Sequence, residues 1–533
     1  MKRSGTTRKA WDQAGTGVLE GKRVVVRAGA GDVTRFGGSP AWRGMVLAAL
    51  LAALAATALA QRPWPPTGSG VHVFNDQLSQ GMSEAQVAFC ATHYDGTQKM
   101  RRTEADRLRA VNPQFMILHY RLGLGLGYRA PEAGCSPTGP WLHIIDGDWT
   151  QEWPGDSAVQ EGWFFHWPPG SETRVYNCDW GWYLIDIGSA AWRTWWSGEV
   201  EDQLAHNDAD GIFMDSYSVP NFLGGASYVP NLPDYDLAFE NAWKTRIRDY
   251  LVWLKVRFAH KAWIVPNVAS WITGRDDTDY SPADGMMVEG FAMEADASPY
   301  PFDDWRLSMD RIVAATTRGQ AVIGQTYVTG AQERLFTVGC YLLFRGGRSY
   351  VNLDIDLDPE WWPEYDIPIG RALHAAVSSI DELDADADRI YRRDFDNGLV
   401  LVNPTNPWDG SGVTRDVDLG APFRRAWGNG GGFVGSDGVP TGTLFYETVT
   451  SVNLPPAMAA VLLFDPAQLA VGDLNLDGRV DAADLVILGA YLVGSVSQGT
   501  PPFTAPLTAA DVNRDLARNA LDLVTLADSL SAR

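Results

Sequence analysis

Short apolar runs alternate with longer amphipathic segments over the first two-thirds of the chain. Eight runs resemble strands because they are rich in β-branched and other apolar residues: 71–75, 87–94, 115–120, 210–217, 262–268, 284–292, 320–328 and 349–355. Segments of helical character fall between most of them, including 190–207, 237–258, 305–318 and 333–346. Eight strands alternating with helices predict an α/β fold of the (β/α)8 TIM-barrel type. The alternative is an open doubly wound sheet, although no Gly-rich phosphate loop supports its nucleotide-binding versions.

The N-terminal region departs from this pattern. Residues 45–60 form an apolar run that ends in Ala58-Leu59-Ala60. The run is short for a membrane span and ends in a small-residue cleavage pattern, which is typical of a secretory signal. We therefore expect a secreted protein, extracellular or attached to a cell surface, with no membrane span in the mature chain.

Changes in composition divide the remaining chain. A Gly-, Pro- and Trp-rich insertion separates the third and fourth strand-like runs, and short strands with turns follow the barrel, which predicts a β-sandwich. The expected organisation is an N-terminal extension and signal peptide at 1–60, a linker at 61–70, a barrel at 71–384 with its insertion at 121–209, a β-sandwich domain at 385–466 and a C-terminal module at 471–533.

The C-terminal module contains a calcium-loop pattern twice. Calcium takes six to eight oxygen ligands, and a twelve-residue loop supplies them from positions 1, 3, 5, 7, 9 and 12. In the first loop these positions are Asp473, Asn475, Asp477, Arg479 through its backbone carbonyl, Asp481 and Asp484. In the second loop they are Asp511, Asn513, Asp515, Ala517 through its carbonyl, Asn519 and Asp522. Leu516 replaces the glycine expected at the sharp turn, so we expect the second site to be weaker or distorted.

Two loop–helix repeats that end in Asp resemble a type I dockerin. The resemblance implies a Ca²⁺-dependent module that binds a cohesin on a scaffold or cell surface. It also implies that the remainder of the chain is an enzyme that degrades polysaccharide. The calcium would then order a docking surface, and no cofactor is expected for catalysis.

Bulk composition limits the partners. The chain has a net charge of −22, and loss of the basic residues 1–60 would make it more acidic. Such a surface argues against nucleic acid and anionic membranes as partners. The 22 tryptophans suit either sugar platforms or a packed core, and both uses remain open.

The four cysteines allow three pairings. Cys135 and Cys178 lie in the insertion, and we expect them to form a disulfide. Cys90 and Cys340 lie in apolar runs, and we expect them to be buried thiols.

Candidate chemistry rests on the ends of the strand-like runs, because barrel enzymes place their catalytic groups there. Asp215 ends the fourth run and Glu289 lies near the end of the sixth. Two carboxyl groups facing one pocket are what glycoside hydrolysis requires, although each could instead cap a helix or pair with an arginine. The polar residues expected to bind sugar are Asp76, His119, Tyr120, Tyr217, Asn267 and Gln325.

The sequence DGIFMDSY, the strand set and the tail NGLVLVNPT…VNLPPAMAAVLLF resemble glycoside hydrolase-like barrels with an appended β-domain. An Asp on the fourth strand and an acid on the sixth are similar to α-galactosidase-type barrels. That similarity implies a retaining mechanism with Asp215 as nucleophile and Glu289 as acid/base, although those barrels carry Asp at the sixth-strand position.

We therefore expect a secreted glycoside hydrolase that cleaves O-glycosidic bonds in a polysaccharide or oligosaccharide. The alternative is a non-catalytic carbohydrate-binding or surface-assembly protein on the same scaffold. The separation of the two carboxyl groups discriminates between these functions.

Overall fold

The fold was examined in a computed structural model. It describes residues 61–78, 81–127, 159–177, 179–294, 296–353, 358–373, 377–465, 472–475, 479–497, 507–510, 512 and 518–531. The expected N-terminal extension and signal peptide therefore lie outside the described residues. Within these ranges, none of the helices is both long and apolar enough to cross a membrane.

Parallel strands form the centre of the fold. One sheet has the order β1 (Gly96–Gln98), β2 (Met116–Leu122), β6 (Gly211–Asp215) and β8 (Trp263–Pro266). A second sheet contains β9 (Gly285–Glu289), β10 (Ala321–Gln325) and β11 (Ser349–Asn352). All pairings between neighbours in these two sheets are parallel. The predicted α/β class is confirmed.

Isolated bridges connect the two sheets. Asn267 and Met287 form a parallel bridge between the segment after β8 and β9. Val73 bridges Val351 of β11, and the neighbouring Phe74 bridges Gly96 of β1, both in parallel. Residues 73–74 therefore lie between the outer strands of the two sheets and add an eighth parallel segment.

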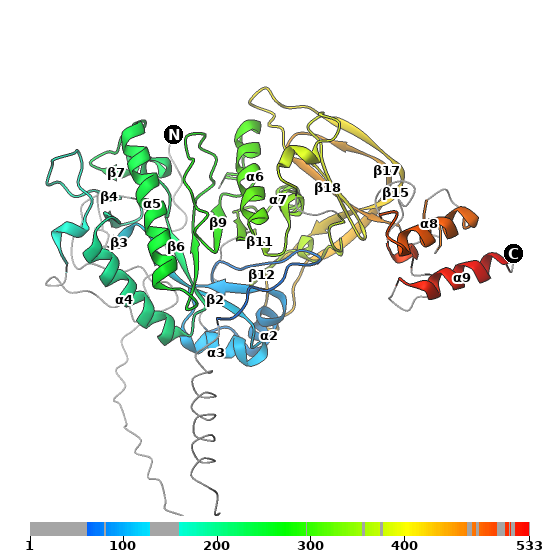
Figure 1. Ribbon diagram of the computed structural model, residues 1–533, viewed down its shortest axis with the longest axis horizontal. Helices are drawn as coiled ribbons and strands as arrows, with labels where there is room; N and C mark the ends of the chain where they lie inside the picture. Colours follow the sequence, from blue (N-terminus) through cyan, green and yellow to red (C-terminus); the bar gives the residue numbers. More distant parts are fainter. Residues whose placement is uncertain are drawn as a thin grey trace, which may run out of the picture. The chain divides into compact units, whose positions relative to one another are not determined.

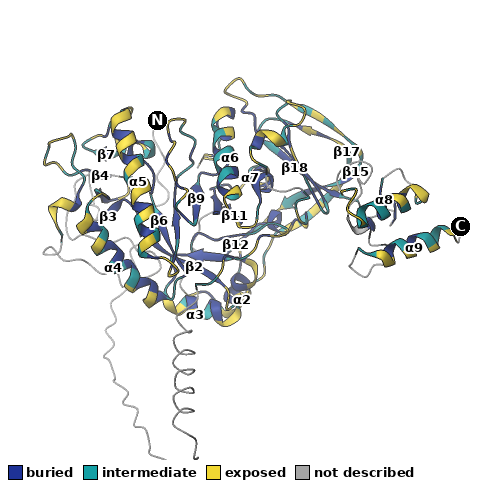
Figure 2. Cartoon of the chain, viewed as in Figure 1, coloured by how far each residue is buried: buried dark blue, intermediate teal, exposed yellow. Residues whose placement is uncertain are grey.

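Helices follow most of the strands. They are α3 (Arg102–Val111), α4 (Ala190–Asn207), α5 (Leu237–Arg257), α6 (Phe302–Thr317) and α7 (Ala331–Phe344). The starts of α4 and α5 are fixed by Ser189 and Asp236, whose side chains accept hydrogen bonds from backbone N–H groups of the first turn. The long helices α4 and α5 flank the strands and expose their outer faces (Figures 1 and 2). The helices predicted at 190–207, 237–258, 305–318 and 333–346 are confirmed.

The strand predicted at 87–94 is wrong. Residues Glu84–His93 form helix α2, and the second parallel strand, β1, begins only at Gly96. A short apolar run does not distinguish a strand from a buried helix. The helix is favoured by a capping box, in which Ser83 and Gln86 satisfy each other's backbone N–H groups.

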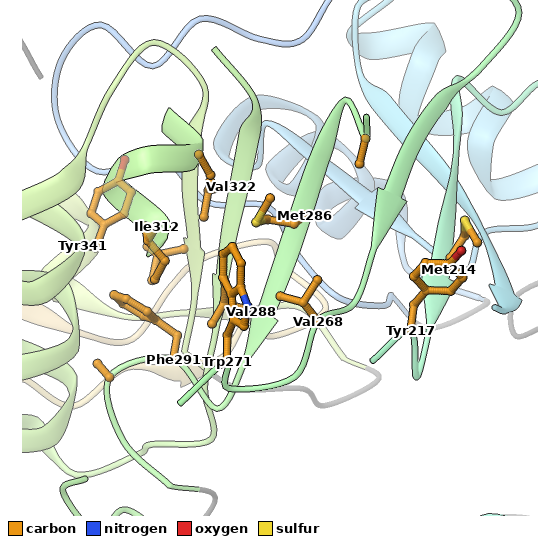
Figure 3. Close-up of a cluster of buried hydrophobic side chains, with 14 of the residues drawn as sticks. Met214, Tyr217, Val268, Trp271, Met286, Val288, Phe291, Ile312, Val322 and Tyr341 are labelled. Atoms are coloured by element: carbon orange, nitrogen blue, oxygen red, sulfur yellow. The ribbon is translucent and has the colours of Figure 1, made fainter. Parts of the chain in front are cut away.

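Side chains alternate between two cores along the parallel strands, as the period of a strand requires. One set forms what we term the central cluster: Phe74, Met116, Leu118, Tyr120, Phe213, Val265, Met287, Ile323 and Tyr350, with Trp64 and Ala321. The intervening residues pack with the helices. Figure 3 shows part of this outer core, where Met286, Val288 and Val322 of the strands lie near Ile312 of α6 and Tyr341 of α7.

The insertion contributes three strands to a small antiparallel sheet with the order β3-β5-β4-β7. These are β3 (Gly125–Gly127), β4 (Tyr176–Asn177) and β5 (Trp182–Leu184), with the short helix η1 (Glu161–Trp163) between β3 and β4, and the fourth strand, β7 (Tyr228–Val229), follows β6. Trp163 and Trp182 are buried, whereas Trp180 is 74% exposed. The insertion therefore uses its tryptophans both in a loop core and at the surface.

An antiparallel β region follows the last parallel strand. Its five-stranded sheet has the order β13-β14-β18-β15-β17. The strands are β13 (Tyr391–Phe395), β14 (Gly398–Asn403), β15 (Arg415–Asn429), β17 (Thr443–Leu454) and β18 (Met458–Phe464), and a separate pair joins β12 (Glu360–Trp361) to β16 (Gly432–Phe433). Helix α7 packs closely on the larger sheet, because a Cβ on Gly339 would lie 2.5 Å from the Cβ of Ala459. The sandwich form of this region stays a prediction.

Two short helices form the C-terminal module. They are α8 (Ala482–Leu492) and α9 (Ala520–Ser531), with the short helix η6 (Leu507–Ala510) between them. Its core consists of Leu474, Ile487, Leu488, Ala509, Ala510 and Leu526.

Candidate active site

Polar side chains replace the apolar ones at the carboxyl ends of the parallel strands. The strand alternation places them on the same face as the central cluster. They are Asp76, Gln98, Tyr120, Asp215, Asn267, Glu289, Gln325 and Asn352. Each of the eight parallel segments thus contributes one polar group to this layer. Hydrogen bonds join Asp76 to Gln98, Tyr120 to Asp215, Asn267 to both Asp215 and Glu289, and Asn352 to Gln325.

Three donors hold the carboxylate of Asp215 in place. The backbone N–H of Ser216 and the amide of Asn267 donate to Oδ1 at 2.7 Å and 2.9 Å. The hydroxyl of Tyr120 donates to Oδ2 at 2.6 Å. Ser216 has a φ of 54°, and this left-handed conformation directs its N–H back to the preceding carboxylate. Asp215 is therefore fixed in orientation while it remains partly accessible.

Glu289 lies on the other side of the same amide. Its Oε2 accepts a hydrogen bond of 2.5 Å from Nδ2 of Asn267, and its Oε1 accepts one from the hydroxyl of Tyr327. The carboxyl is also partly accessible. Two donors from two different strand ends thus orient this second carboxyl group.

One nitrogen atom limits the separation of the two carboxyl groups. Nδ2 of Asn267 lies 2.9 Å from Oδ1 of Asp215 and 2.5 Å from Oε2 of Glu289. The two carboxyl oxygens can therefore be no farther apart than the sum of these lengths, about 5.4 Å. This bound on the nearest oxygens matches the spacing of about 5–5.5 Å typical of retaining glycosidases more closely than the spacing of about 6.5–9.5 Å typical of inverting ones.

The surroundings favour the protonated form of Glu289. Burial raises the pKa of Glu289 above its ordinary value, and the negative charge of Asp215 raises it further. The hydrogen bonds from Tyr327 and Asn267 act in the opposite direction and lower this pKa. Burial and the charge of Glu289 in turn raise the pKa of Tyr327, so its phenol remains a neutral donor. Burial and the neighbouring charge thus favour Glu289 as the proton donor of the pair.

A further carboxylate, Asp76, lies in the same layer. Its Oδ1 accepts a hydrogen bond from Gln98, and its Oδ2 lies 2.8 Å from Nζ of Lys99. The negative charge of Asp76 also contributes to the raised pKa of Glu289, which places Asp76 within electrostatic reach of the pair. Gln325 lies farther round the layer, where its Oε1 accepts a hydrogen bond of 3.0 Å from Asn352.

Two predicted sugar-binding residues lie elsewhere. His119 faces the helical side of β2, where Nε2 lies 2.8 Å from Oε1 of Gln203 on α4. Tyr217 is fully buried in the outer core, and its hydroxyl donates to the carbonyl of Ile247 on α5 (Figure 3). We therefore exclude both from the candidate site. Asn267, which was also predicted to bind sugar, lies in the candidate site, but its amide donates to the two carboxyl groups.

Sequence reasoning missed three residues of the site. The sequence pattern predicts the second strand at 87–94, too early in the chain, and therefore does not identify Gln98 and Lys99 as strand-end residues. Tyr327 follows β10 by two residues and continues the alternation of Ile323 and Gln325, a signal that was present in the sequence. Two other carboxyl groups near β9 lie outside the site: Asp284 precedes β9 and pairs with Lys255, and Glu294 is exposed in the following loop.

A hollow in the insertion is separate from the carboxyl pair. It has a volume of about 730 Å³ and is lined by residues of the insertion, including Glu161, Arg174 and Tyr183. Arg174 and His166 both contact Glu161, and these contacts lower the pKa of Glu161 to about 2. None of the strand-end polar residues lines this hollow, so we place the candidate active site at Asp215 and Glu289.

The described part of the first calcium loop has a compatible donor set. Asp473 and Asp484 are buried, and Oδ1 of Asp484 accepts hydrogen bonds from the backbone of Leu474 and Asn475. Asp481 caps α8 and donates its own N–H to Oδ2 of Asp484. Buried oxygen ligands in a closed loop fit a calcium ion.

The second loop follows the same design. The N–H of Asn519 donates to Oδ2 of the buried Asp522 at 2.8 Å. Among the described residues no three His, Cys, Asp or Glu side chains gather as a metal cluster. The predicted ligands that lie outside the described residues are Asp477, Asp511, Asn513, Asp515 and Ala517.

The structure describes two of the four cysteines. Cys90 and Cys340 are buried free thiols, as predicted, although Cys90 lies in helix α2 and not in a strand. Cys135 and Cys178 lie outside the described residues, so their disulfide stays a prediction.

The parallel α/β core and its strand-end carboxyl pair define a glycosidase-like class of protein. Sequence comparison agrees, because the profile described as hypothetical glycosyl hydrolase family 15 matches residues 109–399. The chain belongs to this family. The profile of the type I dockerin domain matches residues 471–531, so the chain ends in a dockerin, and domains of this type bind calcium. Comparison with curated proteins gave no match.

Solved glycosidases resemble the chain at low similarity. An α-amylase from Anoxybacillus is 11% identical, with a TM-score of 0.33, over 76% of this chain and 99% of the amylase. The GH36 α-galactosidase AgaA from Geobacillus stearothermophilus is 9% identical, with a TM-score of 0.35, over 74% of this chain and 55% of AgaA. At these scores the resemblance carries no conclusion about activity.

Proposed function

We propose that the eight parallel segments close into a (β/α)8 barrel and that the chain is a retaining glycoside hydrolase. In this proposal Asp215 is the nucleophile and Glu289 is the acid/base. The observation that carries it is the amide of Asn267, which donates to both carboxyl groups and limits the distance between the two accepting oxygens to about 5.4 Å. The bridges of residues 73–74 and of Asn267 support closure of the barrel.

The first step forms a covalent bond to the enzyme. An oxygen of Asp215 attacks the anomeric carbon of the sugar while Glu289 transfers its proton to the leaving oxygen. The glycosidic C–O bond breaks, its electron pair stays on the leaving oxygen, and the released fragment departs as an alcohol. Tyr120 and Ser216 hold the attacking carboxylate, so little reorientation is needed before attack.

The second step releases the sugar. The negative charge that raised the pKa of Glu289 has disappeared, because Asp215 is now esterified. Glu289, left ionised by the first step, therefore becomes a base that takes a proton from water. The water oxygen bonds to the anomeric carbon, the ester bond breaks, and both carboxyl groups return to their starting states.

The dockerin indicates where this chemistry takes place. A calcium-loaded dockerin implies a cohesin-type partner, so we propose a secreted enzyme held at an extracellular scaffold or cell surface. Its substrate would be a polysaccharide or oligosaccharide. The β-sandwich predicted at 385–466 would be an accessory domain, with α7 packed against its main sheet. The alternative of a non-catalytic binder is disfavoured by the paired carboxyl groups, since a binder needs no second acid.

The proposal is tested by hydrolysis of a panel of 4-nitrophenyl glycosides and polysaccharides with the full chain. Asp215→Asn should remove nearly all turnover, on the order of a thousandfold or more, because the neutral amide cannot form the ester. Glu289→Gln should spare aryl glycosides far more than substrates with poor leaving groups, because activated leaving groups need little protonation. Glu294→Gln changes an exposed carboxyl in the loop after β9 and should leave activity unchanged. Full activity in Asp215→Asn would refute the mechanism.

A further inference from the structure

Lys99 is held in a strained position beside the carboxyl pair. It directly follows β1 and has a φ of 62°, in the left-handed region that residues other than glycine seldom adopt. Its ammonium lies 2.8 Å from Oδ2 of Asp76 and 5.0 Å from the centre of the Tyr120 ring. Tyr120 is the residue whose hydroxyl bonds Asp215. The strained backbone of Lys99 therefore places a cation beside Tyr120, the residue that holds the proposed nucleophile Asp215.

Fold stability does not account for this arrangement. The side chains of Lys99 and Asp76 are only 13% and 6% exposed, and removing two charges from water offsets most of their attraction. The unfavourable backbone conformation of Lys99 adds a second cost. Two unfavourable features at one strand end, beside the candidate catalytic groups, indicate a functional role.

The pair is part of the same site as the catalytic carboxyl groups. The charge of Asp76 contributes to the raised pKa of both Glu289 and Tyr327, so it acts on the acid side of the site. The ring of Tyr120 connects Lys99 to the nucleophile side. Lys99 and Asp76 therefore belong to the same polar layer as Asp215 and Glu289.

We propose that Lys99 and Asp76 together bind hydroxyl groups of the sugar whose bond is cleaved, and that they select uncharged sugars. This inference rests on the proposed function. An ammonium has three N–H donors and a carboxylate has several lone pairs, so the two groups can bond each other and still donate to one hydroxyl and accept from another.

Charge balance gives the selectivity. The proposed mechanism starts with a protonated Glu289 and an ionised Asp215, and the ion pair of Asp76 with Lys99 adds no net charge, so the four groups would carry one net negative charge. A uronate carboxylate would therefore be repelled, whereas a neutral hexose or pentose would lose nothing.

The test compares Lys99→Met with Lys255→Met in the full chain. Lys255 also pairs with a carboxylate, Asp284, but that pair lies at the start of β9, at the opposite end of the strand from Glu289. The probes are 4-nitrophenyl glycosides of neutral sugars, the 4-nitrophenyl uronides of matching configuration, and a deoxy analogue of the best neutral glycoside at each ring hydroxyl. We expect the wild type to hydrolyse a neutral glycoside at least tenfold faster than its uronide.

Lys99→Met should lower kcat/KM for that glycoside at least tenfold, with a loss of less than threefold for one of its deoxy analogues. Lys255→Met should leave both values unchanged. Wild-type kinetics in Lys99→Met would overturn the inference, and so would a preference of the wild type for the uronide. Neither result would affect the proposed function, which depends on the loss of activity in Asp215→Asn.

A binding measurement keeps the two proposals separable. Saturation-transfer NMR with the free neutral monosaccharides should show contact in the wild type and Lys255→Met, and loss of contact in Lys99→Met. Equal signals in all three proteins, or no signal in any of them, would overturn the inference. If sugar binds in this pattern but the wild type hydrolyses no glycoside, the inference stands and the hydrolase proposal fails.

Discussion

The hydroxyl of Tyr120 donates a hydrogen bond of 2.6 Å to Oδ2 of Asp215. The two residues belong to neighbouring parallel strands, β2 and β6, and Tyr120 is itself buried in the central cluster. A packed ring therefore fixes one side of the proposed nucleophile. In a retaining reaction this hydrogen bond would orient the carboxylate for attack, and it would also slightly reduce the nucleophilicity of the carboxylate. Because orientation is the larger effect, removing the hydrogen bond should lower kcat.

Tyr120→Phe should lower kcat by about ten- to a hundredfold with little change in KM, because the carboxylate would lose its aligned position. Steady-state kinetics on an aryl glycoside measure this effect. Tyr217→Phe is the matched control, since its hydroxyl bonds the carbonyl of Ile247 in the outer core. That variant should lose about 1 kcal/mol of stability and retain kcat. A larger catalytic loss in Tyr217→Phe than in Tyr120→Phe would contradict this assignment.

The pH dependence of kcat/KM should be set on its alkaline side by Glu289, which must be protonated to act as an acid. The hydroxyl of Tyr327 stabilises the ionised form of Glu289 and lowers its pKa. Tyr327→Phe should therefore raise this pKa further and move the alkaline limb to higher pH. Tyr350→Phe is the control, because that hydroxyl bonds the carbonyl of Pro65. A limb that moves to lower pH in Tyr327→Phe would exclude Glu289 as its origin.

Calcium should order the dockerin. Adding Ca²⁺ to chelated full-length protein should slow amide hydrogen exchange in α8, because an ion that binds only the folded form stabilises it, by about 2.7 kcal/mol at a hundred times its dissociation constant. The double change Asp473→Ala with Asp477→Ala should remove most of this protection. Asp528→Ala, an exposed residue of α9, should not. Identical exchange with and without calcium would refute calcium binding.

The cysteines should divide into two chemical classes. Burial raises the pKa of the Cys90 and Cys340 thiols, so both should resist iodoacetamide in the folded protein and react after unfolding. Cys135 and Cys178 should resist it in both states unless a reductant is present, because we expect them to be bridged. Mass spectrometry of labelled peptides distinguishes these states. Four reactive thiols after unfolding without reductant would exclude the disulfide.

The sequence was sufficient to predict that Asp215 and Glu289 lie at strand ends. Asp215 and Glu289 follow apolar runs whose alternation is regular, and a strand's period of two places both on one face. The same rule shows why His119 and Tyr120 could not both face the site: consecutive residues of β2 point in opposite directions. The choice between them depended on register, which the sequence alone leaves open.

Other parts of the site depend on contacts distant in the sequence. Tyr217 would continue the alternation of Phe213 and Asp215, but the left-handed conformation of Ser216 breaks the period and turns the tyrosine toward α5. Lys99 was hidden because residues 87–94 are equally compatible with a strand or a buried helix. Only the capping interaction of Ser83 and the packed tertiary structure settle that segment.

A buried ion pair provides the final prediction, on stability. Arg334 of α7 bonds Glu364 through two nitrogens, each 3.0 Å from a different carboxylate oxygen, and the side chains are only 4% and 0% exposed. The arginine also donates to the carbonyl of Gly430 and lies over the ring of Trp362.

Glu364→Ala should therefore lower the free energy of unfolding by about 3–5 kcal/mol, because it leaves a buried guanidinium without its carboxylate. Replacing both residues by leucine should restore part of this loss, since no unpaired charge then remains. The more accessible pair of Arg392 and Asp394, with side chains 57% and 25% exposed, is the control, and Asp394→Ala should change stability by no more than about 1 kcal/mol. Urea unfolding of the full chain, followed by tryptophan fluorescence, measures all three, and equal effects of Glu364→Ala and Asp394→Ala would show that burial of the pair does not determine its contribution.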